Sequence, residues 1–392
     1  MARKTRIGIL TGGGDVPGLN SVIKTLVYRS TEEADFEVVG IRRGWEGLTH
    51  LNLVDGEDAD YVVSLHRQNT RAVDRTGGTF LHTSRTNPSK LSIKNLPSLV
   101  AEKVGGLKTS GEGVVDATPL VMENLEKLGI DYLVAIGGDD TLSYASVLDR
   151  AGVPIVAVPK TMDNDVQNTE YCIGFSTAIS RAVSAITRLR TTLGSHERIG
   201  VFRMFGRDSG FTAFYTAYVA SVRCCIPEAE FDLERLMQIL VNDKRNNPSR
   251  YALVLLSEGA SWAGRDVEEY GPADAYGHKR RANVAEVFAW NLREVTNEDS
   301  TVVDLSYDLR SGEPDFLDKM VATTFATMAF ECIVSRAQGR MMAIRKGCYA
   351  DTDIPDPKLG PRKIDVDNMY DRDRFRPIYE SKKGLPIFMM TI

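Results

Sequence analysis

The sequence contains little cysteine and histidine, the residues that bind zinc or form disulfide bridges. Each occurs five times in 392 residues. The cysteines form no C-x-x-C pair and their number is odd, so reduced thiols in the cytoplasm fit better than a disulfide framework. The histidines show no ligand spacing such as H-x-x-x-H, which argues against a transition-metal site. We therefore expect a cytoplasmic protein without zinc.

Long apolar runs and an excess of positive charge are also missing. No stretch approaches the roughly 18 apolar residues of a membrane span. The N-terminus offers only Ile7 to Leu10 before a glycine cluster, which is too short for a signal peptide. Lys and Arg number 48 against 53 Asp and Glu, so the formal net charge is -5. We expect no membrane and no nucleic-acid partner, and an anionic ligand would need a local basic pocket.

The length and the hydrophobic pattern indicate an α/β protein of roughly two or three domains. Hydrophobic residues make up 43% and charged residues 26%, as in soluble globular chains. No repeat of 20 to 50 residues is evident, which argues against a solenoid or propeller. Apolar residues at helical spacing predict a helix that contains Ile179 and Leu189, with Arg181, Arg188 and Arg190 on a solvated face. Short β-branched runs predict strands at 6–11, 37–41, 132–136, 154–158, 198–203 and 251–256.

Two other segments are predicted to be irregular. The glycine-rich stretch 103–113 is interpreted as a loop between ordered regions. The proline-rich stretch 351–361 is predicted to run as an extended connection on the surface.

The loop 11–20 (TGGGDVPGLN) follows the first predicted strand and leads into a predicted helix from Ser21. Glycines let backbone N–H groups approach an anion, and the helix N-terminus adds partial positive charge, so a phosphate site is indicated. A P-loop is excluded because Leu19 and Asn20 stand where Lys and Ser/Thr are needed. A dinucleotide fingerprint is disfavoured by Pro17 and by basic residues after the second strand. A glycine turn without a ligand remains the alternative.

The loop 137–141 (GGDDT) places two carboxylates directly after another predicted strand. Two carboxylates are costly to desolvate together, so they either face water or hold a cation such as Mg²⁺. Alternatively, Asp139 or Asp140 caps a helix that begins near Thr141.

The loop 158–165 (VPKTMDND) follows a third predicted strand and gathers Lys160, Asp163 and Asp165. Together they offer a cation for phosphate oxygens, a candidate general base and a possible metal partner. Turn chemistry alone would also explain the Asp-Asn-Asp run. It would not explain why the lysine and the carboxylates gather where the other two loops should converge, outside the carboxyl ends of the strands.

These three loops resemble the signature loops of the 6-phosphofructokinases. Five further segments resemble the family's sugar-phosphate segments in the same order, and the resemblance spans residues 5–345. These segments are 77–81 leading to Arg85, 195–198, 205–207, 257–259 and 307–312.

The resemblance implies a phosphofructokinase fold, with two Rossmann-like lobes that have mainly parallel sheets flanked by helices. It implies a lobe for the phosphoryl donor and Mg²⁺ at 1–174 plus about 310–350. The lobe for the sugar phosphate would comprise about 175–309 plus the C-terminal segment 351–392. The chain would cross between the lobes more than once.

By the same resemblance, Asp163 is the base that takes the proton from the 1-hydroxyl of fructose 6-phosphate, and Thr161 helps to hold the transferred phosphoryl group. Asp139 binds Mg²⁺, with Asp165 nearby. The residues that surround the phosphoryl groups of the donor are Gly13, Arg85 and Lys160.

For the sugar phosphate, the resemblance implies that Glu258 accepts hydrogen bonds from hydroxyls. Tyr307 and Arg310 would bind the 6-phosphate. Arg198 would reach into the site of a neighbouring subunit, which implies a homodimer or homotetramer. The residues that line the pocket would be Phe205, Gly206 and Arg207.

Two departures from the family pattern concern the donor. ATP-using members typically have Gly where Asp140 and Lys160 stand. A side chain at position 140 would intrude on the α-phosphate of ATP, whereas pyrophosphate has no such group. Asp140 and Lys160 thus resemble the pyrophosphate-dependent branch, and both are assigned to the catalytic site.

Three alternatives remain open from the sequence. An ATP-dependent 6-phosphofructokinase is the nearest. An NAD or lipid kinase also uses a GGD loop, but it would lack the 159–165 run. A sugar-phosphate sensor with an inactive site would lack the base, yet Asp163 is present.

Overall fold

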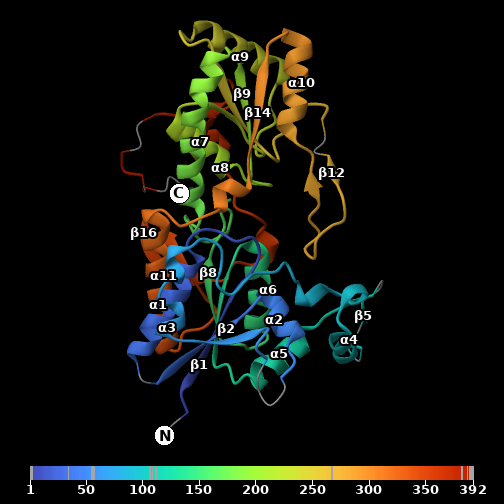
Figure 1. The fold of residues 1–392 in the computed structure, drawn as a ribbon, viewed down its shortest axis with the longest axis vertical. Coiled ribbons are helices and arrows are strands. Elements are labelled where there is room, and N and C mark those ends of the chain that lie inside the picture. The colour runs from blue at the N-terminus through green and yellow to red at the C-terminus, as the bar shows by residue number, and fades with distance from the viewer. Residues whose placement is uncertain are drawn as a thin grey trace.

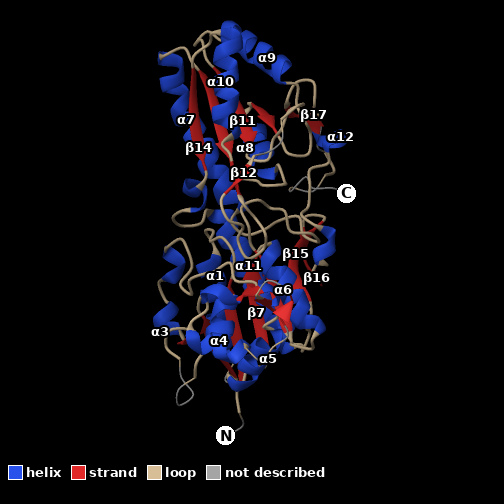
Figure 2. Ribbon diagram, turned by 90° about the vertical axis from the view of Figure 1, so that its right-hand side faces the viewer, coloured by secondary structure: helices blue, strands red, loops and turns tan. Residues whose placement is uncertain are grey.

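The computed structural model has two main β-sheets, one at each end of an elongated molecule (Figure 1). A view turned by 90° shows that mostly loops fill the region between them (Figure 2). The structure describes residues 3–33, 35–53, 58–105, 107, 109–110, 113–265, 268–380, 383–385 and 387.

The first sheet has seven strands and is parallel at its centre. Strand β1 pairs with β2 on one side and with β7 on the other, so the strand order reverses at this point. Only the edge strands β3 and β16 run antiparallel to their neighbours. Their order is β16 (Cys348–Asp353), β15 (Arg340–Arg345), β8 (Ile155–Pro159), β7 (Tyr132–Gly137), β1 (Thr5–Thr11), β2 (Phe36–Ile41) and β3 (Val62–Leu65).

Helices cover both faces of this sheet because alternate strand residues point to opposite sides. Ile7 and Ile9 face one core, which contains α1 (Leu19–Glu32) and α11 (Phe316–Val334). Leu10 and Leu133 face another core, which contains α2 (Trp45–His50), α5 (Thr118–Lys127) and α6 (Asp139–Arg150). The sheet is therefore buried on both sides.

The second sheet has four parallel strands in the order β10 (Arg223–Cys225), β11 (Ala252–Ser257), β9 (Ile199–Met204) and β14 (Ser300–Leu305). Phe202 and Leu255 face the core that includes α7 (Phe175–Ser195) and α8 (Phe211–Ala220). Val201 and Val254 face the core of α9 (Leu233–Asn246) and α10 (Val284–Thr296).

Smaller elements complete the fold. A three-stranded sheet combines β4 (Leu91–Ser92), β6 (Val114–Val115) and β5 (Thr109–Ser110). Two short hairpins pair β12 (Glu269–Tyr270) with β13 (Arg280–Arg281) and β17 (Tyr370–Asp371) with β18 (Arg376–Pro377). The remaining short helices are α3 (Arg67–Thr70), α4 (Ser98–Val104) and α12 (Val366–Met369).

The chain passes between the two sheets more than once. After β14 in the second sheet it forms α11, β15 and β16 of the first, and β18 then contacts β10 of the second. Residues 351–353 form the end of β16 and pair with β15 in the seven-stranded sheet. The lobe boundaries expected from the sequence remain a prediction.

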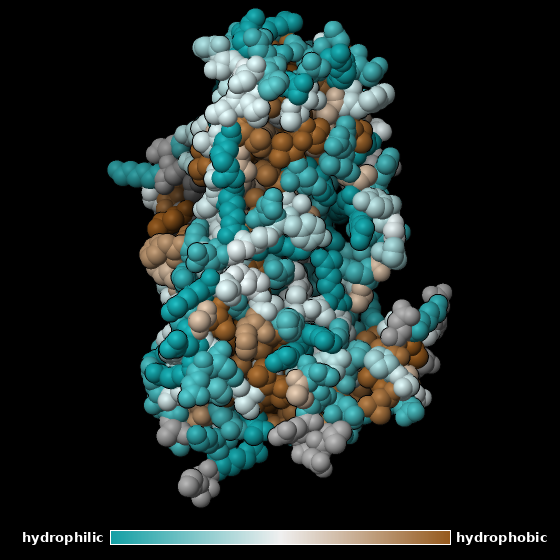
Figure 3. Space-filling view, in the orientation of Figure 1, coloured by the Kyte–Doolittle hydropathy of each residue, from teal (hydrophilic) through white to brown (hydrophobic). Residues whose placement is uncertain are grey.

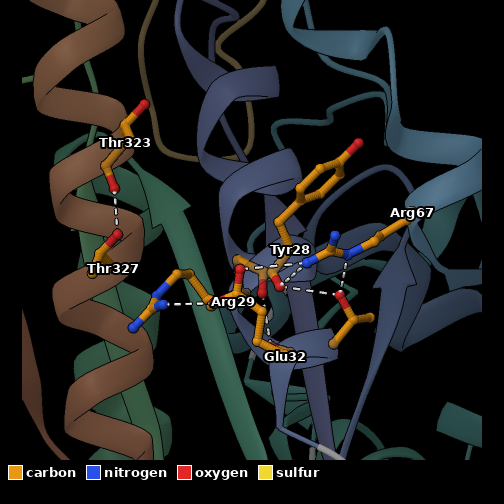
Figure 4. A network of polar contacts seen from close by, with 9 residues as sticks. Tyr28, Arg29, Glu32, Arg67, Thr323 and Thr327 are labelled. Carbon is orange, nitrogen blue, oxygen red and sulfur yellow. Dashed lines mark hydrogen bonds and ion pairs between the residues drawn. The ribbon is translucent and has the colours of Figure 1, made fainter.

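Helices α1 and α11 pack side by side on the first sheet (Figure 4). The Arg67 guanidinium of α3 lies 4.7 Å from the ring centroid of Tyr28 and donates to the Tyr28 carbonyl oxygen at 3.3 Å. Arg67 also pairs with Glu32, which accepts from Arg29 at 2.7 Å. These partly solvated contacts fasten α3 to α1.

Asp318 on α11 joins the two sheets through a buried network. Its carboxylate is fully buried and accepts from Tyr171 Oη at 2.6 Å and from the Gly174 amide at 2.7 Å. It also accepts from the amide and the hydroxyl of Thr177. These partners precede or begin α7, so Asp318 holds the chain where it leaves the first sheet for the second.

The predicted strands and the helix containing Ile179 are confirmed, each strand within one residue at either end. The prediction that three arginines of this helix lie on a solvated face is wrong for Arg181 and Arg190. Arg181 donates to the Glu313 carbonyl and Arg190 to the Ala220 carbonyl, whereas Arg188 is exposed.

The two segments predicted to be irregular are partly regular. Within 103–113, α4 extends to Val104 and β5 spans Thr109–Ser110, while residues 106, 108, 111 and 112 lie outside the described residues. Within 351–361, the first three residues belong to β16, because β15 offers them a strand edge to pair with. Across the described residues, no helix combines the length and the apolar character that crossing a membrane requires.

Replacing Asp318 with Ala should destabilise the protein strongly, because four buried donors would lose their acceptor. We expect the free energy of unfolding to fall by at least about 3 kcal/mol, measured by urea denaturation. Asp367→Ala is the control, since Asp367 is exposed and its pair with Arg372 is solvated. A loss of stability no larger than that of the control would contradict the role of Asp318.

Candidate active site

Three loops meet at the carboxyl ends of β1, β7 and β8, where the strand order of the first sheet reverses. The Gly12 amide donates to the Ile136 carbonyl at 3.0 Å, and the Lys160 amide donates to the Gly137 carbonyl at 2.9 Å. Ligands of open α/β sheets bind at such a point. The convergence predicted from the sequence is confirmed.

The first loop requires glycines because side chains of other segments lie very close to its backbone. A Cβ atom at Gly12 would lie 2.6 Å from Thr141 Oγ1, and one at Gly14 would lie 2.7 Å from Arg310 Nη1. Gly13, predicted to contact the donor, lies between them with its amide bonded to the Ser84 carbonyl at 3.1 Å. Cationic side chains thus reach the loop backbone directly, which goes beyond what a plain glycine turn requires.

Lys160 is a buried cation at this loop. Its side chain is 3% exposed, and Nζ donates to the Gly14 carbonyl oxygen at 2.6 Å. Burial, and to a smaller extent the charge of Arg310, lowers the pKa of Lys160 to about 8, while Asp15 and Asp140 act in the opposite direction. An anionic ligand bound beside Lys160 would therefore stabilise its charged form.

Asp139 and Asp140 form the first turn of α6 and do not cap it. The N-cap is Gly138, without a side-chain hydrogen bond, so the capping alternative is wrong. Burial raises the pKa of Asp139, and the neighbouring Asp140 raises it further. Asp140 instead lies 3.3 Å from Nε2 of His278, which comes from the segment between β12 and β13.

Asp163 and Asp165 are two carboxyls in close electrostatic contact. Burial raises the pKa of Asp163 well above its usual value, and Asp165 and Glu258 raise it further. Arg207 and Arg310 oppose this shift. Asp163 Oδ1 is buried without a hydrogen-bond partner among the described residues. An oxygen of this kind is available to a ligand proton.

Thr161 and Arg362 shape the same loop. The Thr161 hydroxyl accepts from the Asp163 amide at 3.1 Å, which brings it beside the predicted base. Arg362, which the sequence did not indicate, donates from its backbone amide to the Asp165 carbonyl at 2.6 Å. Its guanidinium donates to the Asn164 carbonyl, so it fixes the backbone of the loop.

The carboxyls suit a cation that is shared with a phosphate ligand. Among the described residues, no three His, Cys, Asp or Glu side chains are gathered as a complete metal site. However, burial raises the pKa of Asp165, and Asp139 raises it further, so the two carboxyls repel each other and lack a full counter-charge. Mg²⁺ is usually held by one or two carboxylates together with substrate phosphates and water, and Asp139 and Asp165 fit that donor set.

Arg310 connects the glycine loop with two aromatic rings. Its guanidinium lies 4.5 Å from the Tyr307 ring centroid and 5.8 Å from that of Phe205. The two rings meet edge to face at 5.5 Å. Arg310 Nε lies 3.8 Å from Asp15 Oδ1. Phe205, Tyr307 and Arg310 therefore form one wall near the glycine loop.

Glu258 lies at the carboxyl end of β11 and is buried. Burial raises its pKa, whereas Arg203 and Arg207 lower it. Arg203 Nη2 donates to Glu258 at 3.0 Å. Gly206 adopts a φ of 133°, where a side chain would be strained, and its carbonyl accepts from Ser257 Oγ at 2.7 Å. Residues 205, 206, 207 and 258, which were predicted to form the sugar site, are thus brought together.

Arg198 lies outside this compact group, whereas Arg85 borders it, because the carbonyl of the preceding Ser84 accepts from the Gly13 amide. Arg85 Nη1 pairs with Asp274 at 3.0 Å, and its charge influences Lys160. Arg198 directly precedes β9, whose six residues separate it from Phe205 by about 20 Å. Within one chain, Arg198 therefore does not join the other predicted residues.

The structure adds residues that sequence reasoning missed. Arg203 had one signal, because it is a charged residue inside an otherwise apolar strand. Asp274 and His278 had none, since they belong to no recognised motif and lie more than 130 residues from their partners.

The surface between the two sheets is mostly hydrophilic to intermediate on the face shown in Figure 3. A separate cavity of about 350 Å³ lies at the amino ends of β10 and β11, on the side of the second sheet away from the loops above. It is lined by Arg190, Arg223 and Asp243, among others.

Comparison with known proteins gives a consistent result. The family model described as Phosphofructokinase matches residues 6–333. The chain is 34% identical to the ATP-dependent 6-phosphofructokinase 3 of Streptomyces coelicolor, with 87% of this chain and 91% of that protein covered. It is 35% identical to the pyrophosphate--fructose 6-phosphate 1-phosphotransferase of Thermoproteus tenax, with 90% and 92% covered.

A solved structure shares the fold. The pyrophosphate-dependent phosphofructokinase from Marinobacter aquaeolei superimposes with a TM-score of 0.74 at 16% identity, covering 97% of this chain and 95% of that chain. The expected fold class is confirmed.

Deprotonation of Lys160 should weaken the binding of an anionic phosphoryl donor. Since the pKa of Lys160 is about 8, we expect kcat/KM for the donor to fall as the pH rises through that value. Lys160→Met should lower kcat/KM about tenfold or more and remove this dependence. Steady-state rates across the neutral and alkaline range provide the measurement. Lys24 lies on α1 and pairs with Asp74, so Lys24→Met serves as the control and should keep the wild-type dependence of kcat/KM on pH.

Proposed function

The chain belongs to the phosphofructokinase family, and on that premise we propose that it transfers a phosphoryl group from pyrophosphate to the 1-hydroxyl of fructose 6-phosphate. The product is fructose 1,6-bisphosphate, and the reaction is reversible and depends on Mg²⁺. The observation that carries the proposal is the buried Asp163 oxygen without a hydrogen-bond partner among the described residues, on a carboxyl whose ionised form Arg207 and Arg310 favour.

Asp163 is the general base in this proposal. Its Oδ1 is free to accept the proton of the sugar 1-hydroxyl as that oxygen attacks the phosphoryl group. A raised pKa makes the carboxylate a stronger base once it is ionised, and the nearby guanidinium groups of Arg207 and Arg310 favour the ionised form. Thr161, held beside Asp163, contacts the transferred group.

The donor lies against the glycine loop. Lys160 reaches this loop, and Arg85 adds a second cation. Fixed cations of this kind stabilise the charge that develops on the phosphoryl oxygens during transfer. Gly13 has no side chain, so the phosphate can approach the loop backbone closely.

Asp139 holds Mg²⁺ in the proposal, with Asp165 close by. The bound ion supplies charge neutralisation to the phosphoryl oxygens. Without it, the two carboxyls and the polyanionic donor would repel one another, which supports the dependence on Mg²⁺.

The sugar phosphate lies on the side of the second sheet. Glu258 accepts hydrogen bonds from sugar hydroxyls, and its bond with Arg203 orients the carboxylate. Phe205, Gly206 and Arg207 line the pocket. Tyr307 and Arg310 bind the 6-phosphate, the one through its hydroxyl and the other through its guanidinium.

Pyrophosphate is favoured as the donor by Asp140. Asp140 lies in the first turn of α6, next to Thr141, which contacts Gly12 of the glycine loop. The additional phosphate and nucleoside of ATP would meet a like charge and a side chain there. The runner-up is an ATP-dependent 6-phosphofructokinase. It has support from the relatives, because names of both kinds occur at similar identity.

The active unit in this proposal is a homodimer or homotetramer in the cytoplasm. Arg198 lies at the end of β9 away from its own site, so it is placed to serve the site of another copy. Its guanidinium would then contact the sugar 6-phosphate from the neighbouring subunit.

Assays of the purified protein with each donor test the proposal. We expect kcat/KM for pyrophosphate to exceed that for ATP by at least about tenfold. Asp140→Gly should raise the ratio of ATP to pyrophosphate activity by about tenfold, because it removes both bulk and charge. Asp140→Ala separates the loss of the side chain from the added backbone freedom, and Asp149→Ala at the other end of α6 is the control. Turnover with ATP alone would refute pyrophosphate as the donor.

Asp163→Asn should abolish turnover while leaving sugar binding intact. We expect kcat to fall at least about 100-fold, because the amide cannot accept the hydroxyl proton. Calorimetric titration with fructose 6-phosphate should give a dissociation constant near the wild-type value. Retained turnover would show that another group is the base.

A further inference from the structure

A β-hairpin reaches from the second sheet to the donor side of the site. This segment, residues 268–283, is called the strap below. It lies between β11 and α10, and its β12 and β13 pair through Glu269 with Arg281 and Tyr270 with Arg280. Figure 1 shows it descending along the side of the molecule toward α6.

The tip of the strap contacts two walls of the donor site. Asp274 Oδ2 pairs with Arg85 Nη1 at 3.0 Å, and Tyr276 Oη donates to the Thr86 carbonyl oxygen at 3.0 Å. On the other wall, His278 Nε2 lies 3.3 Å from Asp140. The tip therefore bridges the loop that contains Arg85 and the first turn of α6.

The base of the strap contacts the sugar side. Arg281 donates to the backbone carbonyl of Arg207 and lies 2.7 Å from Asp208 Oδ1. The strap thus extends from Arg207, in the predicted sugar site, to Arg85, in the predicted donor site.

The two oxygens of Asp274 have separate roles. Oδ1 accepts from the backbone amides of Tyr276 and His278, each at 3.0 Å, and so shapes the turn at the tip. Oδ2 faces Arg85. Although burial raises the pKa of Asp274, the two amides, His278 and Arg85 outweigh it and hold the pKa below its usual value. Asp274 is thus an anion at neutral pH.

We propose that Asp274 is a positioning residue that competes with the phosphoryl donor for Arg85. This inference rests on the proposed function, which places the donor phosphates at Arg85. The Asp274 carboxylate occupies the guanidinium that an anionic donor needs, so the donor binds by displacing it. The tip of the strap is released from Arg85 at that moment, while the contacts of Arg281 keep its base on the sugar side.

The solvent exposure of the Arg85–Asp274 ion pair supports the displacement of Asp274 by the donor. The Arg85 side chain is 51% exposed and that of Asp274 is 20% exposed, so water screens the attraction. A donor that carries several negative charges makes stronger, charge-assisted contacts with the same guanidinium. The Asp274 contact therefore tunes donor affinity without blocking the site.

Asp274→Asn tests this competition without unfolding the tip. The amide oxygen can still accept from Tyr276 and His278, whereas the amino group that replaces Oδ2 no longer attracts Arg85. We expect KM for pyrophosphate to fall about 2- to 5-fold, with kcat and KM for fructose 6-phosphate close to wild type. Binding of imidodiphosphate with Mg²⁺, measured by calorimetry, should tighten by the same factor.

Two variants complete the test. Asp274→Glu restores the anion and should bring KM for pyrophosphate back toward wild type. Asp299→Asn makes the same change of charge in a pair with Arg293 at the opposite end of the second sheet, and it should leave every constant unchanged. An unchanged or raised KM for pyrophosphate in Asp274→Asn would overturn the competition, since a raised KM would mean that Asp274 assists the donor.

The outcome is separable from the identity of the donor. If the wild-type protein uses ATP instead of pyrophosphate, the proposed function fails in that respect, and the same fall in KM is then sought with ATP. If pyrophosphate is the donor and its KM does not fall, only the role of Asp274 fails.

Discussion

The parallel pairing of β1, β7 and β8 is the constraint on which the rest of the site depends. Because the three strands run in the same direction, their following loops must leave the sheet at one edge. Backbone bonds such as that from the Lys160 amide to the Gly137 carbonyl then fix the loops against one another. The position of Asp139, Lys160 and Asp163 follows from strands that are buried for hydrophobic reasons and contribute no chemistry themselves.

Charge balance is the second constraint at this edge. The carboxyls of Asp139, Asp163 and Asp165 are partly removed from water and repel one another, which costs free energy. Cations are crowded there as well, since the charge of Arg310 lowers the pKa of the buried Lys160. A ligand that carries phosphate and a divalent cation would satisfy both groups at once, so the protein without ligands retains an imbalance that binding removes.

The sequence was sufficient to predict the sheet strands and the convergence of the three loops, because strand periodicity and the residues just after each strand are local features. It did not predict the partners of Arg85 and Asp140. Asp274 and His278 approach them through a hairpin whose path depends on tertiary packing, and no spacing rule connects residues so far apart. Arg203 gave one signal, as a charged residue in an otherwise apolar strand, but its partner Glu258 follows another strand. Arg198 lies away from the other site residues in one chain, so its predicted role concerns contacts between copies of the chain.

The order in which the chain visits its two sheets has a consequence for how the protein is made. Strands β15 and β16 complete the seven-stranded sheet, but they follow all four strands of the second sheet in sequence. During synthesis on the ribosome, the edge of β8 that pairs with β15 therefore stays unpaired until residues 340–353 have emerged. An unpaired edge of this kind can recruit other chains, and contacts so distant in sequence form slowly. The nascent chain is thus most prone to aggregation while the residues of its second sheet are being translated.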